Sequence, residues 1–440
     1  MKLWALERFT DKLQTTKKLL SVWRVDDNIL KLRFETGSYF FDMRRGESLI
    51  YPEPEGFVEN KRYNSPFDVQ LAKTVNTSDI QSAELCNGDK ILRLGLQKAG
   101  KYKSLQYALV FEFTGKFTNA VILDEKGSVI EALRHIDASV SVRELKPGLP
   151  YEYPPKNDLK LAPAERVEDI DAYLAAEHQK RTDIELRGLK KQHLAKLAKK
   201  IKRLRQVYDS LESVESLREK SARLYEKANL LMANRHKIPP YATKATLHDY
   251  EGNEVQVELE GVGSVNKTID TIFKQAKKAA SKAENIHREQ DSLEEKIAFL
   301  ERFAKVVEQA PNRHALQILF PKTVKSKQER PVEHYETFFI KGFRVLLGKN
   351  ERGNIELLKN ARAGDIWMHL KDRPSSHIII PTNKQEVPET VLFEAGKLCA
   401  SFSAEFGGNY AVDYTQRRNV KVKSGANVEY KFYKTIHISI

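Results

Sequence analysis

The sequence predicts an α+β protein of several domains: a β-rich α/β domain at the N-terminus, a long antiparallel coiled coil with a small β tip, and an α/β domain at the C-terminus. The chain of 440 residues is too long for one compact core. Alternating apolar residues, typical of strands, gather toward both ends, whereas leucines spaced three and four apart fill the middle. Charged residues reach 30%, which a long solvated element explains.

Residues 1–150 are expected to form the first domain. Residues 29–34 alternate apolar and polar side chains, and residues 37–42 follow after a turn, so this stretch predicts a hairpin. Further strands are expected at 105–113, 120–123 and 128–133. The prolines from Pro147 to Pro155 then punctuate the chain and mark a domain boundary.

The middle domain is expected over residues 164–310. Two apolar seams at heptad spacing predict two helical arms. The first seam is Leu194, Leu197, Ile201, Leu204, Tyr208 and Leu211, and the second is Ile286, Leu293, Ile297, Leu300, Ala304 and Val307. Residues 230–266 are the expected tip, since Pro239-Pro240 breaks the helix and residues 249–259 resemble a hairpin. A helix over residues 180–226 would be about 70 Å long, enough to bridge separated points on a large assembly.

The C-terminal part is expected to consist of a linker and a second α/β domain. Residues 311–334 are polar and basic and are interpreted as the linker. Residues 335–440 contain a hairpin at 338–348, a strand at 376–380 and an amphipathic helix at 388–402.

Composition limits the class of partner. The net charge is +14 with an isoelectric point near 9.3, which attracts polyanions such as nucleic acid or an anionic membrane. No uncharged apolar run approaches the ~20 residues that span a bilayer, and residues 1–9 lack the apolar core of a signal peptide. Cys86 and Cys399 are too few for a disulfide framework. We therefore expect a cytoplasmic protein that does not bind a membrane.

The stretch from Lys180 to Arg205 carries eleven lysines and arginines against two carboxylates. Like charges along a helix repel one another unless an anion neutralises them, and a phosphate backbone does so while it releases counterions. The alternative is a solvated coil face with incidental lysines, but the lopsided charge ratio favours a polyanion. The expected RNA contacts here are Lys196, Lys199, Lys200, Lys202, Arg203 and Arg205.

Two clusters near the C-terminus are further candidates. Arg417, Arg418 and Lys421 stand among amides and a tyrosine, which suits RNA, although a charged edge strand explains them equally well. The second cluster is Trp367, His369, Lys371, Arg373 and His377. Two histidines without a third ligand at diagnostic spacing do not predict a metal site, so a structural or RNA-contacting role is expected. No cofactor is expected.

Motifs of enzymes are missing from the sequence. It contains no phosphate-binding Gly-x-x-x-x-Gly-Lys loop, no dinucleotide fingerprint, no Cys-x-x-Cys and no His-Glu-x-x-His. Ser376 and His377 are neighbours in an expected strand, where they would point to opposite faces. The sequence therefore disfavours an enzyme with its own active site.

Several motifs resemble the NFACT family. Residues 338–350, 365–372, 374–377, 413–416, 419–421 and 433–436 resemble its RNA-binding domain. Residues 228–234 and 250–252 are similar to the middle region, and residues 115–123 to the N-terminal domain. The resemblance spans most of the chain and is most specific at the C-terminus.

The resemblance implies a role in ribosome-associated quality control. Members of this family bind large ribosomal subunits, contacting rRNA and proteins, that carry an obstructed peptidyl-tRNA. They recruit tRNA, chiefly alanyl-tRNA in bacteria, so that the stalled chain gains an untemplated C-terminal tail. The ribosome makes the peptide bonds, so the resemblance implies no catalytic residue, and we expect a monomer when the chain is off the ribosome.

The family uses an Asp-Arg pair to engage tRNA, and Asp89-Lys90 matches it by position. Lysine keeps the charge but loses the planar fork of arginine. The helix-hairpin-helix segment of the family has no counterpart, and Glu7 is the nearest equivalent of its acidic residue near the N-terminus. Two alternatives remain: a surface adhesin, since relatives have been labelled fibronectin- or fibrinogen-binding, and a nucleic-acid enzyme.

Overall fold

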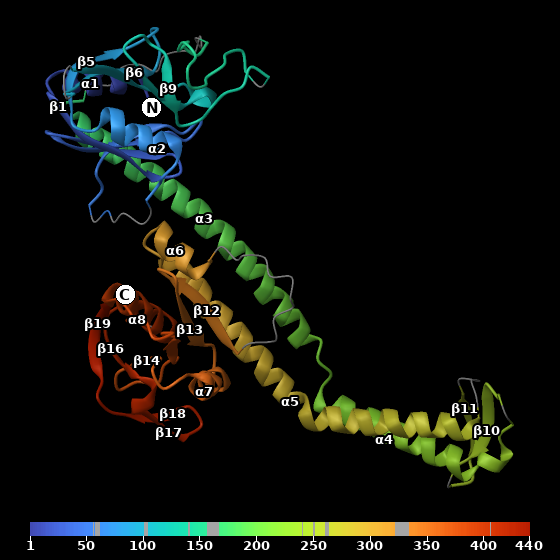
Figure 1. Cartoon of the computed structure of the whole chain (residues 1–440). Coiled ribbons are helices and arrows are strands. Elements are labelled where there is room, and N and C mark those ends of the chain that lie inside the picture. Colours follow the sequence, from blue (N-terminus) through green and yellow to red (C-terminus); the bar gives the residue numbers. More distant parts are fainter. Residues whose placement is uncertain are drawn as a thin grey trace. The chain divides into compact units, whose positions relative to one another are not determined.

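The computed structural model describes residues 1–55, 57, 62–100, 104–139, 141–155, 167–239, 241–249, 251–259, 264–321, 334–404 and 406–440. They fall into two compact units, 1–185 and 186–440. Figure 1 shows the elements: a β-rich sheet near the N-terminus, long helices in the middle and a second sheet near the C-terminus. The mixed fold class predicted from the sequence is confirmed.

The N-terminal unit is built on a nine-stranded sheet in the order β4-β3-β2-β1-β5-β6-β7-β8-β9. All of its neighbouring strands pair antiparallel. The strands are β1 (Lys18–Asp26), β2 (Ile29–Phe34), β3 (Gly37–Asp42), β4 (Leu49–Pro52), β5 (Ser78–Leu85), β6 (Ile91–Lys98), β7 (Leu105–Glu112), β8 (Asn119–Leu123) and β9 (Val129–Ala132). The predicted hairpin at 29–42 and the predicted strands around 105–133 are confirmed.

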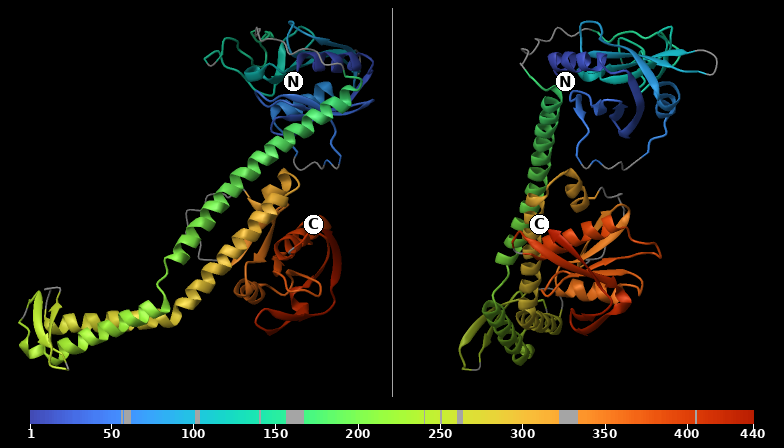
Figure 2. Two further views of the ribbon diagram at one scale, coloured as in Figure 1. Left: turned by 180° about the vertical axis from the view of Figure 1, so that it is seen from behind. Right: turned by 90° about the vertical axis from the view of Figure 1, so that its left-hand side faces the viewer.

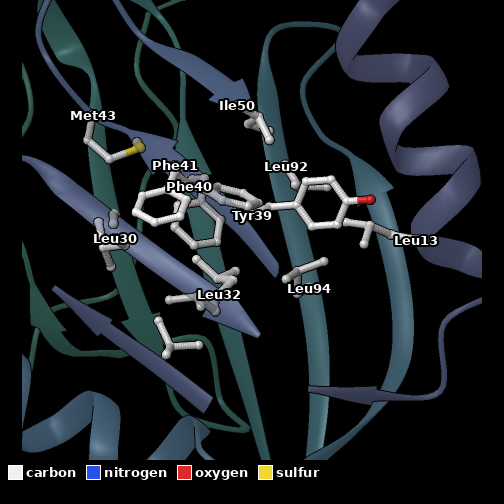
Figure 3. Close-up of a cluster of buried hydrophobic side chains, with 14 of the residues drawn as sticks. Leu13, Leu30, Leu32, Tyr39, Phe40, Phe41, Met43, Ile50, Leu92 and Leu94 are labelled. Atoms are coloured by element: carbon white, nitrogen blue, oxygen red, sulfur yellow. The ribbon is translucent and has the colours of Figure 1, made fainter. Parts of the chain in front are cut away.

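Helices α1 (Leu3–Gln14) and α2 (Pro66–Gln70) belong to the same unit. Leu6, Phe9 and Leu13 follow helical spacing on α1 and are fully buried in the core. They pack with the aromatic side chains of β3, including Tyr39 and Phe41; Figure 3 shows this cluster around Leu30, Leu32 and Leu92. The last four residues of β3 are buried without alternation, because both faces of that part of the strand are covered.

Helix α3 (Ile170–Asp209) begins within this unit rather than outside it. Leu174 is fully buried in the N-terminal core, and the hydroxyl of Tyr39 donates to Asp171 at 2.9 Å. The domain boundary expected at residue 150 therefore differs from the structure, because an apolar face at the start of α3 completes the core. Residues 156–166 of the expected boundary lie outside the described residues.

Helix α4 (Val214–Ala233) lies antiparallel against α5 (Val265–Gln309), as Figure 2 shows in both views. Leu217 packs with Ile286, while the Ser221 hydroxyl donates to the carbonyl of Ala276 at 3.0 Å. The continuous helix predicted over 180–226 is wrong, since α3 ends at Asp209. The Ser213 hydroxyl caps α4 by accepting from the Ser216 amide at 3.1 Å, which starts a new helix there.

The end of this helix pair carries the strands β10 (Lys244–His248) and β11 (Glu254–Glu258). The predicted hairpin at 249–259 is shifted, because its first half is the turn and its first strand comes earlier. The Asp249 carboxylate accepts from the amides of Glu251 and Asn253 at 2.9 and 2.8 Å, which fixes that turn.

The C-terminal sheet has the order β12-β13-β15-β14-β16-β19, with a separate hairpin β17-β18. Its strands are β12 (Tyr335–Ile340), β13 (Phe343–Gly348), β14 (Ile366–Leu370), β15 (Ile378–Ile380), β16 (Asn409–Gln416), β17 (Val420–Ser424), β18 (Asn427–Tyr430) and β19 (Lys434–Ser439). Helices α7 (Glu351–Asn360) and α8 (Glu389–Ser403) complete it. The predicted hairpin, strand and helix of this domain are thus confirmed.

The expected linker, 311–334, begins as helix α6 (Arg313–Leu319). Its Leu316, Ile318 and Leu319 are buried in a core shared by α3, α5 and the C-terminal sheet. This part of the prediction differs from the structure, because three apolar residues in a short basic stretch suffice to anchor a helix. Residues 322–333 lie outside the described part of the chain.

Candidate nucleic-acid interface

Four cations form a stripe along α3, which we call the α3 stripe: Lys196, Lys199, Lys200 and Arg203. They follow i, i+3, i+4 and i+7 spacing and are exposed, while Leu197 on the opposite side is buried. Within the described residues none of the four forms an ion pair. Because lysines four residues apart repel each other, the stripe lowers the stability of its own helix. An external anion would relieve that repulsion.

Lys202 and Arg205 lie on α3 beside the stripe. Lys202 is exposed like its neighbours. Arg205 instead forms an ion pair with Glu301 of α5, with 2.5 Å between its guanidinium nitrogen and the carboxylate oxygen. Arg205 differs from the α3 stripe because its charge is matched by a carboxylate that lies 96 residues away in sequence, and its role as an RNA contact stays a prediction.

Trp367 and His377, predicted as RNA contacts, lie inside the C-terminal domain. Trp367 is fully buried and His377 is 3% exposed. The indole Nε1 of Trp367 donates to Nδ1 of His377 at 3.4 Å, and the Trp367 ring lies 4.7 Å from the ring of Tyr430. Trp367 therefore lies beneath the surface and is not placed to contact RNA directly, whereas His377 lines a cleft and its contact with RNA stays a prediction.

Lowering the pH is expected to destabilise the folded chain through His377. Burial, then repulsion from His369 and Arg417, lowers the pKa of His377 to about 3. The unfolded chain binds this proton near pH 6.5, so stability is lost as pH falls from about 6.5 toward about 3. Between about pH 7 and about pH 5, the free energy of unfolding measured with denaturant should fall by about 2 kcal/mol more for the native chain than for His377→Gln.

The matched control for this experiment is His437→Gln, because His437 is exposed on β19. That variant should follow the native pH profile. An identical profile for native chain and His377→Gln would contradict the burial of a neutral imidazole.

His369, Arg373 and His377 line a cleft of ≈ 860 Å³, here called the His369 cleft. Arg302, Lys349 and Tyr430 also line it. The loop between β14 and β15 is held in place by two serines: the Ser375 hydroxyl accepts from the amide of Leu370 at 3.0 Å, and Ser403 accepts from the amide of Ser376 at 3.0 Å. Burial lowers the pKa of His369, so a neutral imidazole faces the cleft.

Arg373 is exposed and lines the His369 cleft, and Lys371, which is exposed too, lies two residues before it on the same loop. The Lys371 ammonium lies 6.0 Å from the ring centre of Tyr433, and the Arg373 guanidinium lies 5.7 Å from that of Tyr410. Cations beside aromatic rings can contact phosphates while the rings stack on bases. The structure places His369 and Arg373 in one cleft, while the role of His369, Lys371 and Arg373 as RNA contacts stays a prediction.

The predicted cluster of Arg417, Arg418 and Lys421 does not form one surface, because Arg417 is partly buried and the other two are exposed. The Arg417 guanidinium donates to the carbonyls of Leu358 and Val420 at 2.9 and 2.7 Å, so Arg417 fastens α7 to the β17 hairpin. Arg417 thus has a structural role, and its role as an RNA contact stays a prediction. Arg418 and Lys421 are exposed, and neither lines the His369 cleft.

Sequence reasoning missed the aromatic residues between β18 and β19 as contacts. Phe432 is 87% exposed and Tyr433 44%. The ring of Tyr430 lies 5.2 Å from that of Tyr433, and the Tyr430 hydroxyl donates to Asp413 at 2.8 Å. The signal was present in the run Tyr430-Lys431-Phe432-Tyr433-Lys434, in which aromatic and basic residues alternate.

Asp89 and Lys90 lie in the tight turn between β5 and β6, where Asn87 and Gly88 both have positive φ. Oδ1 of Asp89 accepts from the amide of Lys90 at 2.7 Å, while Oδ2 is buried and has no hydrogen-bond partner in the described residues. A buried carboxylate oxygen without a donor is costly, so a ligand could supply the missing one. Glu7 is exposed on α1.

The described part of the chain contains neither a cluster of metal ligands nor a helix that could span a membrane. No group of three His, Cys, Asp or Glu side chains is placed to hold a metal ion. No helix there has the length and apolar character needed to cross a bilayer.

Two models of protein-family domains match the chain. A model of the NFACT N-terminal and middle domains matches residues 57–187 and 175–320, more than half of the chain. A model of the NFACT protein RNA binding domain matches residues 334–430. The chain belongs to the NFACT family. In this NFACT protein the His369 cleft and the exposed aromatic residues lie within or beside the matched RNA-binding domain.

This NFACT protein aligns with only part of the length of its curated relatives. It is 27% identical over 237 residues to the Rqc2 homolog RqcH of Bacillus subtilis (strain 168), covering 50% of the chain and 40% of the relative. The corresponding protein of Streptococcus suis (strain 05ZYH33) is 25% identical over 238 residues, covering 49% and 41%. The aligned region is thus about two fifths of the length of these relatives.

Solved structures include the N-terminal part of the fibronectin/fibrinogen-binding protein from Streptococcus suis. It is 18% identical with a TM-score of 0.32, covering 62% of this chain and 98% of that one.

Proposed function

We propose that this NFACT protein acts in ribosome-associated quality control. It binds large ribosomal subunits that carry an obstructed peptidyl-tRNA and recruits tRNA, in bacteria alanyl-tRNA, so that the stalled chain gains an untemplated C-terminal tail. The matched RNA-binding domain and the relatives named Rqc2 homolog RqcH support this role. The partners are large-subunit rRNA and proteins together with tRNA, and the site of action is the cytoplasm.

The observation that carries the proposal is the α3 stripe. Its four cations are exposed and unmatched within the described residues, whereas Arg205 one turn away is matched by Glu301. A solvated coil face would be expected to pair most of its charges at spacings of three and four. A row of unpaired cations on a rigid helix is what a phosphate backbone binds, with release of counterions.

The proposal gives the chain no active site of its own. Two side chains of the C-terminal domain that could act as base or nucleophile are shielded: His377 is 3% exposed, and burial raises the pKa of the Cys399 thiol to about 12. Peptide bonds would be formed by the ribosome. The surface adhesin is the less supported alternative, because the matched C-terminal domain is described as RNA-binding.

Replacing Asp89 is expected to reduce tRNA recruitment without releasing the chain from large subunits. Asp89→Ala removes both the acceptor that orders the Lys90 amide and the oxygen without a donor. Hydrogen bonds to a charged group are worth about 1.5–3 kcal/mol, so tRNA recovered with the purified complex should fall about 10- to 100-fold. The measurement is quantification of tRNA on chain-bound large subunits.

Asp124→Ala is the matched control, since Asp124 makes the same kind of turn in the same sheet by accepting from the amides of Lys126 and Ser128. Asp89→Asn removes the negative charge but keeps a side-chain oxygen that can accept from the Lys90 amide, so it separates the effect of charge from that of the turn geometry. Equal tRNA recovery from Asp89→Ala and Asp124→Ala would refute a tRNA role for the β5–β6 turn.

A further inference from the structure

A second cleft in the C-terminal domain lies at the other end of strand β14 from the His369 cleft. It measures ≈ 1040 Å³, and we call it the Phe432 pocket. Ile366, the first residue of β14, lines it, whereas His369 and Leu370 at the far end line the other cleft. None of the predicted RNA contacts of this domain lines the Phe432 pocket.

Phe432 is held in an unusual position at the rim of this pocket. Its backbone has φ +52, a left-handed conformation that costs a non-glycine residue energy. The Thr415 hydroxyl donates to the carbonyl of Phe432 at 2.9 Å, while the Asn419 amide group donates to the same hydroxyl oxygen at 2.9 Å. The structure therefore fixes the backbone and leaves the ring 87% exposed.

An aromatic ring held in water by a strained, pinned backbone gains nothing for folding. The folded chain would be more stable if the ring were buried. Strain that the surrounding structure maintains is typical of functional sites. A planar ligand that stacks on the ring is the simplest occupant, because stacking needs an accessible face.

Amide side chains supply hydrogen-bonding groups inside the pocket. Gln416, at the end of β16, and Gln385, in the loop before α8, both line it. Neither side chain makes a hydrogen bond to the described residues. Each amide offers donors and an acceptor, which match the edges of a nucleobase.

Cations stand around the same opening. Arg362 and Lys434 line the pocket, and within the described residues neither forms an ion pair. Lys384 also lines the pocket, together with the carboxylates of Asp365, Glu386 and Glu389, so the lining carries charges of both signs. A ligand with a flat polar base and one adjoining phosphate can meet the amide groups and one of the unpaired cations.

We propose that the Phe432 pocket binds one unpaired nucleobase of RNA. The base stacks on Phe432, its edge meets the amides of Gln416 and Gln385, and an adjoining phosphate meets Arg362 or Lys434. This inference rests on the proposed function and adds to it a site that reads a base, whereas the α3 stripe contacts phosphates alone.

The test uses the full chain with labelled, short single-stranded oligomers of uridine, adenosine or cytidine, and a ribose-phosphate oligomer of equal length without bases. Fluorescence anisotropy gives the affinities. Phe432→Ala should weaken at least one base-bearing oligomer about 5- to 100-fold and leave the base-free oligomer unchanged. Because Ala keeps Cβ, the backbone strain is the same in both proteins, and Phe432→Trp should restore binding.

Phe406→Ala is the matched control, since Phe406 is 77% exposed and lies outside the pocket. Gln416→Ala should reduce the difference in affinity among the three bases. Equal affinity of the native chain for base-bearing and base-free oligomers overturns the pocket and leaves the proposed function standing. Equal losses from Phe432→Ala and Phe406→Ala also overturn it, as does a free nucleoside monophosphate that binds as tightly as the oligomer.

Discussion

Reversing three charges of the α3 stripe, Lys196→Glu, Lys199→Glu and Lys200→Glu together, is expected to lower affinity for large ribosomal subunits on the order of 10²- to 10³-fold. These ammonium groups are exposed and unpaired within the described residues, so each is available to a phosphate. Loss of three phosphate contacts should reduce the slope of log affinity against log salt by about 2 to 3. Co-sedimentation with purified subunits over a range of salt measures both quantities.

The matched control changes the same net charge elsewhere. Lys17, Lys18 and Lys126 are exposed in the N-terminal unit and belong to neither the α3 stripe nor the clefts of the C-terminal domain. Replacing these three by Glu should shift affinity far less and leave the salt slope near the native value. Equal losses from the two triple variants would mean that overall charge, and not the stripe, governs binding.

Trp367→Ala is expected to lower the free energy of unfolding of the C-terminal domain by about 3–5 kcal/mol. The ring is fully buried, packs among Leu346, Leu357 and Ile379, and donates to His377. Truncation leaves a cavity and an acceptor without its donor. Denaturant unfolding followed by far-ultraviolet circular dichroism measures the loss without relying on Trp367 as the probe.

Tyr433→Ala is the contrasting variant, since Tyr433 is 44% exposed beside Lys371. It should leave stability within about 0.5 kcal/mol and weaken RNA binding. If Trp367→Ala instead weakened RNA binding with stability unchanged, Trp367 would be a ligand contact, as the sequence alone suggested.

Local patterns predicted much of the fold because they act over short distances. The hairpin of β2 and β3 follows from alternation and a turn, and the seam through Leu293, Leu300 and Val307 follows from helical spacing. The break between α3 and α4 was missed, although Ser210 and Ser213 are residues that favour helix ends. Heptad spacing continued across the break and concealed it.

The candidate site was harder to predict, because burial and pairing are set by residues distant in sequence. Trp367 and His369 are two residues apart on β14, so their side chains lie on the same face of the strand. Only Trp367 is fully buried, and the ring of Tyr430 of β18 covers it. Arg203 and Arg205 have similar surroundings in the sequence, but only Arg205 forms an ion pair with Glu301. The exposure of Phe432 depends on the hydrogen bond from Thr415, which no local pattern indicates.

Ultraviolet crosslinking of the native chain in cells, followed by sequencing of the attached RNA, tests the central claim most directly. We expect large-subunit rRNA and tRNA to be enriched over total RNA, with the rRNA crosslinks lost from the triple α3 variant. Crosslinks that follow the abundance of total RNA, or that persist unchanged in the triple variant, would contradict RNA binding by the α3 stripe.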